Sequence, residues 1–116
     1  MWKFPTGITI GKDFKIFAKL FKEEIEKQLK EINGKLLKFT CGYYFLSGFC
    51  KRNNKIVYFA ISDPRFSKEW YYKILIRKAR AVDDFIGEKN HYVSLKEFGK
   101  KVKELTGEEN EMPKLW

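Results

Sequence analysis

Large apolar residues return every three or four positions in the first third of the chain. With the polar residues between them, they give the spacing of an amphipathic helix. We predict that this helix begins after Asp13, a residue type that caps helix N-termini well, and ends at Asn33–Gly34. Its apolar positions are Phe14, Phe17, Ala18, Phe21, Ile25, Leu29 and Ile32.

Between residues 36 and 80 the repeat changes to an alternation with a period of two, which is typical of β-strands. Lys51–Lys55 contains two consecutive Asn residues and predicts a hairpin turn, and Ser62–Arg65 predicts a second turn. A bend near Gly42 or Gly48 is expected because the first strand is long. Three strands are predicted, over residues 36–50, 56–61 and 70–80.

The alternation also divides each predicted strand into two faces. In the last strand, one face carries Tyr72, Ile74 and Ile76, and the other carries Tyr71, Lys73, Leu75 and Arg77. In the first strand, the two sets are Leu37, Phe39, Cys41, Tyr43 and Phe45 against Lys38, Thr40 and Tyr44. One side of the sheet is therefore expected to be buried in the core, and the other to be solvent-exposed, basic and aromatic.

A second helix is predicted near the C-terminus. Ser94 and Glu97 have the spacing of a capping box, and Thr106–Gly107 marks the end of the helix. Its apolar stripe is Leu95, Phe98, Val102 and Leu105. Residues 83–91, before this helix, are predicted to form a polar loop or an irregular extension of the third strand.

The two ends of the chain lack these periodic patterns. Residues 1–12 are predicted to form an N-terminal arm, in which residues 6–11 either add an edge strand or pack as an arm. Residues 108–116 are predicted to be a flexible tail. No repeat or long linker divides the chain, so we expect one domain over residues 1–116.

The element order α-β-β-β-α predicts an α+β fold of two layers. In this fold an antiparallel three-stranded sheet carries two helices on one face. The other face of the sheet then remains open to solvent. The predicted core consists of Phe17, Phe21, Ile25, Phe39, Phe59, Ile74, Ile76, Phe98 and Val102.

Charge changes this picture, because the chain has a formal net charge of +9 and a pI of about 9.5. Residues 1–82 hold 18 Lys and Arg against 7 Asp and Glu, or +11, and residues 83–116 hold 6 against 8, or −2, which together give +9. Such a balance favours polyanionic partners. With 44% hydrophobic residues the chain is too apolar to be disordered. No bilayer-spanning run or secretory signal is visible, so we expect no membrane partner and a cytoplasmic setting.

These observations lead us to predict a small nucleic-acid-binding protein that binds RNA or DNA largely independently of sequence. Aromatic rings would stack on bases and cations would meet phosphates. The predicted site residues are Lys38, Tyr44, Lys51, Arg52, Lys55, Tyr58, Tyr71, Lys73, Arg77 and Arg80. The alternative is a protein-interaction module or small regulator, of viral or mobile-element origin, that acts as a homodimer through the same face. A third interpretation is a plain surface, whose tyrosines only stabilise the sheet.

No motif in the sequence indicates catalysis, so we predict a protein that is not an enzyme and has no cofactor or metal. Cys41 and Cys50 lack the paired spacing of a zinc site. Cys41 is expected in the core, and Cys50, near a strand end, is expected to be partly exposed. One His near loop carboxylates is more often solvated than metal-bound; these residues are Asp83, Asp84, Glu88 and His91.

Overall fold

Ten segments of regular structure follow one another in the computed structural model, which describes residues 2–3, 9–11, 14–42, 45–62, 73–84 and 86–107. In chain order they are β1 (Trp2–Lys3), β2 (Thr9–Gly11), α1 (Phe14–Glu31), β3 (Lys35–Cys41), β4 (Phe45–Arg52), β5 (Lys55–Ser62), β6 (Ile74–Ala79), β7 (His91–Val93), the short 3-10 helix η2 (Leu95–Glu97) and α2 (Phe98–Thr106).

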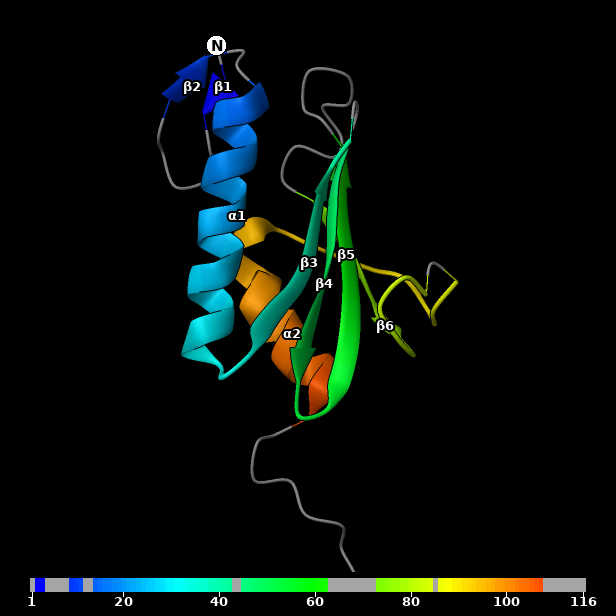
Figure 1. The fold of residues 1–116 in the computed structure, drawn as a ribbon. Coiled ribbons are helices and arrows are strands. Elements are labelled where there is room, and N and C mark those ends of the chain that lie inside the picture. Colours follow the sequence, from blue (N-terminus) through cyan, green and yellow to red (C-terminus); the bar gives the residue numbers. More distant parts are fainter. Residues whose placement is uncertain are drawn as a thin grey trace, which may run out of the picture.

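Within the described residues, the main sheet is antiparallel and has five strands in the order β3-β4-β5-β6-β7. Helices α1 and α2 lie on the same side of this sheet (Figure 1). The predicted α+β class is therefore confirmed. The predicted number of three strands is wrong.

The two additional strands have different origins. The strand predicted over 36–50 reverses after Gly42, whose N–H donates to the carbonyl of Phe45 (2.9 Å), so this segment forms the β3–β4 hairpin. The segment 83–91 was expected to be polar loop, but His91 begins β7, which pairs with β6. Both additions follow from pairing partners that the alternation alone does not specify.

At the N-terminus, β1 pairs with β2 in a separate two-stranded antiparallel sheet. The segment 9–11 therefore adds its strand to this small sheet and not to the edge of the main sheet. The predicted tail, residues 108–116, lies outside the described residues.

Asparagines form the turns that the sequence predicts. Asn33 adopts a φ of 61°, and the N–H of Gly34 donates to the carbonyl of Leu29 (2.7 Å), which ends α1. Asn53 and Asn54 both have positive φ, 53° and 62°, as a two-residue type I′ hairpin requires. These two predictions are confirmed, because few other residues tolerate this backbone region.

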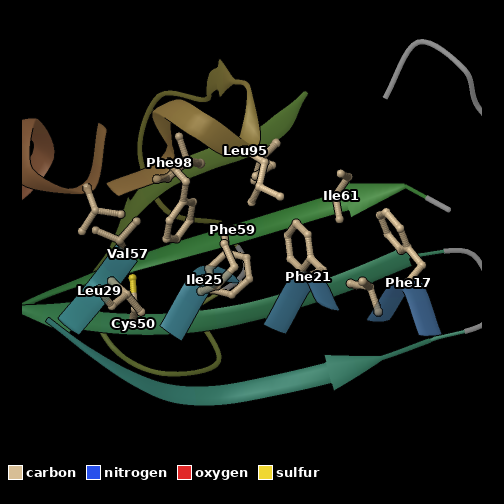
Figure 2. Packing of buried hydrophobic residues seen from close by; sticks show 14 residues of the cluster. Phe17, Phe21, Ile25, Leu29, Cys50, Val57, Phe59, Ile61, Leu95 and Phe98 are labelled. Atoms are coloured by element: carbon tan, nitrogen blue, oxygen red, sulfur yellow. The ribbon is translucent and has the colours of Figure 1, made fainter. Parts of the chain in front are cut away.

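The core lies between the sheet and the two helices, as Figure 2 shows for Phe21, Phe59 and Phe98. Eight of the nine predicted core residues are fully buried, and the ninth, Phe39, is half-buried against the others. Gly48 makes room for this arrangement, because a Cβ there would lie 2.6 Å from the Phe59 ring. The predicted helix-side positions Phe59, Ile74 and Ile76 are thus confirmed. The predicted apolar face of 36–50 is wrong at Phe45, which is 43% exposed, because the reversal after Gly42 begins β4, in which Leu46 and Cys50 point to the helices.

The start of α2 differs from the predicted capping box. Ser94 makes no side-chain capping bond, and the first turn is the 3-10 helix η2. Gln28 of α1 performs the capping: its Oε1 accepts from the N–H of Gly99 and its Nε2 donates to the carbonyl of Leu95, both at 2.7 Å. A buried side chain from another helix therefore replaces the local motif.

The two cysteines are placed opposite to the prediction. Cys50 is fully buried, and this burial raises the pKa of its thiol to about 12. Cys41 is exposed. The reversal at Gly42 explains the error, because it makes Cys50 continue the buried face of β4 while Cys41 ends the edge strand β3.

Candidate functional site

The five strands of the main sheet contain no Asp or Glu. They hold seven Lys and Arg residues, namely two in β3, two in β4, one in β5 and two in β6. The strands of the sheet therefore carry a net positive charge. Any carboxylate near them comes from another segment of the chain.

We define the open face as the side of the sheet that points away from the helices. Alternation and the observed register assign to it Lys35, Lys38, Thr40, Phe45, Ser47, Phe49, Lys51, Ile56, Tyr58, Ala60, Leu75, Arg77 and Tyr92. Lys73, which directly precedes β6, continues the row of Leu75 and Arg77 and is exposed. Ile74 and Ile76, between them, are fully buried on the helix side, as the sequence predicts.

Two lysines lie directly opposite each other at one end of the open face. Lys35 of β3 pairs with Lys51 of β4 in the sheet register, and both are exposed. Like charges directly opposite on neighbouring strands are destabilising. An anion between the two ammonium groups would remove this repulsion. Sequence reasoning missed Lys35, because its pairing with Lys51 depends on the unexpected reversal after Gly42.

Three side chains from neighbouring strands stack in the middle of the open face. The ring centroids of Phe49 (β4) and Tyr58 (β5) are 5.1 Å apart, and the guanidinium carbon of Arg77 (β6) lies 4.5 Å from the Tyr58 ring centroid. Phe49 is only 2% exposed although it faces away from the helices. Arg77 and Tyr58 thus form a cation–π contact, and the Phe49 ring packs against Tyr58.

The loop between β6 and β7, described over residues 80–84 and 86–90, lies over part of the open face. Figure 1 shows this yellow segment on the side of the sheet opposite to α1. Asp83 reaches the edge strand β3, where its Oδ1 lies 2.6 Å from Nζ of Lys38. The side-chain amide oxygen of Asn90 accepts from Nη1 of Arg77 (3.3 Å). We call this segment the β6–β7 loop.

Asp84 holds the β6–β7 loop together from within. Its carboxylate accepts from the backbone N–H groups of Arg80 (2.9 Å), Ile86 (3.2 Å) and Gly87 (3.2 Å). These bonds, led by that from Arg80, hold the pKa of Asp84 well below its usual range.

In the described part of the chain, no group of three or more His, Cys, Asp or Glu side chains is placed to hold a metal ion.

Arg52 does not belong to the open face, and its predicted role needs correction. It is 3% exposed on the helix side. Its Nε donates to the carbonyl of Ile32 (2.7 Å), and its Nη1 donates to Oγ1 of Thr106 (3.0 Å) and to the carbonyl of Gly107. Alternation places Arg52 on the face of Cys50, so this cation satisfies the C-terminal ends of both helices.

The other predicted site residues fall into three groups. Lys38, Tyr58 and Arg77 lie on the open face beneath or beside the β6–β7 loop, and Lys51 and Lys73 lie on its exposed part. Lys55 is exposed at the hairpin end, and Arg80 is exposed and ion-paired with Asp84 at 3.3 Å. Tyr44 and Tyr71 lie outside the described residues.

No family model, curated protein or solved structure matches this chain. Among the helices of the described residues, none has the length and the apolar character that crossing a bilayer requires.

Proposed function

We propose that this chain is a nucleic-acid-binding protein that uses the open face of its sheet. The observation that carries the proposal is the absence of carboxylates from the strands of the main sheet, combined with the open-face cations Lys35, Lys38, Lys51 and Arg77, of which Lys35 and Lys51 are directly opposed. A phosphate between the two ammonium groups would turn their repulsion into two charge-assisted hydrogen bonds. The net charge of +9 supports the same class of partner.

The residues have different roles in this proposal. Lys35, Lys51 and Lys73 contact phosphates on the exposed part of the open face. Lys38 and Arg77 add positive charge nearer the middle, and Tyr58 supplies the ring on which a base can stack. Such contacts depend on backbone charge and on unpaired bases, so binding is largely independent of sequence. Lys55 and Arg80 flank the face, and Tyr44 and Tyr71 remain predictions from the sequence.

Fluorescence anisotropy with single-stranded DNA and RNA oligonucleotides across a salt series tests this proposal. The logarithm of affinity should fall linearly with the logarithm of salt concentration, with a slope of about −0.7 per phosphate contact. The double variant Lys35→Ala/Lys51→Ala should bind more weakly and with a flatter slope. The matched control is Lys19→Ala/Lys27→Ala, which removes the same charge from the exposed side of α1. Equal losses in both variants, or no binding at low salt, would contradict the proposal.

The edges of the main sheet bear on the predicted homodimer. The edge strand β3 has a bulge at Leu37 and carries two lysines, and the opposite edge, β7, has three residues. Short strands, bulges and lysines are the features that keep sheet edges from pairing. A dimer would therefore have to use exposed apolar side chains such as Phe45 and Tyr92. Light scattering that shows a monomer at all concentrations would remove this alternative.

A further inference from the structure

The β6–β7 loop contacts the same residues that the proposed nucleic-acid site uses. Asp83 pairs with Lys38 at 2.6 Å, and Asn90 accepts from Arg77 at 3.3 Å. Arg77 in turn covers the ring of Tyr58. The loop therefore contacts Lys38, one cation of the proposed site, and it also contacts Arg77, which covers the Tyr58 ring.

Gly87 fixes how closely the loop approaches this stack. Its φ is +57°, and a Cβ there would lie 2.7 Å from Nε of Arg77 and 2.7 Å from the carbonyl oxygen of Lys78. The next residue, Glu88, donates its N–H to that same carbonyl at 3.2 Å. Only a glycine allows this contact, so the loop backbone rests directly on β6 and on Arg77.

The ion pair between Asp83 of the loop and Lys38 of β3 is a weak one. The side chains of Lys38 and Asp83 are 45% and 55% exposed, and exposed pairs contribute little to stability. Asp83 has a positive φ of 71°, a backbone conformation that Asp and Asn tolerate better than most other residues. A polyanion that offers a phosphate to Lys38 can therefore displace this carboxylate.

We propose that the β6–β7 loop is an internal competitor of nucleic acid. In its closed position the Asp83 carboxylate stands where a phosphate would bind Lys38, and the loop at Gly87 holds Arg77 over Tyr58. Unpaired bases reach Tyr58 only after the loop has lifted. This inference rests on the proposed function. It specifies that the β6–β7 loop regulates the site and that the site binds single strands with unpaired bases.

The direct test compares two variants that each remove one negative charge from the loop. Asp83→Asn removes the pairing with Lys38 and keeps a residue type that tolerates positive φ. Glu88→Gln, at an exposed position, is the matched control. Anisotropy with a single-stranded oligonucleotide should show about two- to five-fold tighter binding for Asp83→Asn, the range that loss of an exposed ion pair provides. Glu88→Gln should show a smaller gain.

A steric variant tests the same inference without a change in charge. Gly87→Ala places a methyl group against Arg77 and Lys78, which should displace the loop from β6. It should bind the oligonucleotide more tightly than the parent chain while the salt dependence keeps the sign and steepness of the parent. Weaker binding by a folded Gly87→Ala variant would overturn the inference.

Hydrogen exchange at the amide of Glu88 reports loop position without any nucleic acid, because this N–H bonds to β6 when the loop is closed. Relative to the intrinsic rate of each sequence, exchange of the amide at position 88 should accelerate in Asp83→Asn and Gly87→Ala but not in Glu88→Gln. Faster exchange without tighter binding, in a parent chain that binds nucleic acid, would overturn the inference and leave the proposed function intact. Faster exchange in a chain that binds no nucleic acid in any variant would refute the proposed function and, with it, the competition.

Discussion

The two sides of the main sheet both carry aromatic side chains, but different neighbours cover them. On the helix side, Phe59 meets Phe21 and Phe98 with ring centroids 6.3 and 5.2 Å apart, inside a closed apolar layer. On the open face, Phe49 and Tyr58 pack beneath Arg77 and a hydrogen-bonded polar loop. Apolar side chains of the helices cover one side, and exposing them to water is unfavourable. Polar contacts cover the other side, and an anion can replace them. Stability is therefore expected to reside on the first side and binding on the second.

The largest expected loss of stability comes from truncating a buried side chain on the helix side of the sheet. Phe21→Ala should lower the free energy of unfolding by about 3–5 kcal/mol, because it empties a fully buried position. Phe45→Ala removes the same ring from the open face, where it is 43% exposed, and should cost less than about 1.5 kcal/mol. Urea denaturation of both variants measures the difference. Equal losses would remove the distinction between the two sides.

The next effect separates two neighbouring cations of β4. Arg52→Met should cost about 2–3 kcal/mol, because the part-buried carbonyls of Ile32 and Gly107 lose a charged donor. Lys51→Met, one residue away on the open face, should stay within about 0.5 kcal/mol of the parent chain. If thermal or urea unfolding shows Lys51→Met to be the more damaging change, the assignment of the two faces is wrong.

A smaller effect distinguishes the two thiols. At mildly alkaline pH a thiol reagent should modify Cys41 rapidly in the folded protein and reach Cys50 only on unfolding. Burial raises the pKa of Cys50 from 9.0 to about 12, so the folded state holds its proton more tightly than the unfolded state. The contribution of this thiol to stability is present below pH 9.0 and declines as the pH rises toward 12. Equal reactivity of both thiols in the native protein would contradict this placement.

Local patterns predicted much of the fold. The three-to-four-residue spacing located α1, and the positive-φ Asn residues located its end and the β4–β5 hairpin. Alternation assigned Phe59 and Ile76 to the core. These features depend on residues that are close in sequence, and such residues carry their own steric and hydrophobic signal.

The remaining features depend on contacts between distant residues. The alternation over 36–50 runs through Gly42 without an Asn, Asp or Pro to mark a reversal, so the β3–β4 hairpin could not be read from the sequence. Lys38 and Asp83 are 45 residues apart, and no periodicity links them. The inward turn of Arg52 likewise requires the two helix ends, which only the folded chain brings together. The pairing of Lys35 with Lys51 and the contact of Asp83 with Lys38 therefore became visible only in the structure.

The most direct measurement is an amide chemical-shift titration of the whole chain with a single-stranded oligonucleotide at low salt. If the open face binds nucleic acid, the perturbed amides should belong to Lys35, Lys38, Lys51, Tyr58 and Arg77, and those of the exposed side of α1 should stay in place. Perturbations confined to α1, or none at an oligonucleotide excess, would contradict the proposal that the open face is the binding surface.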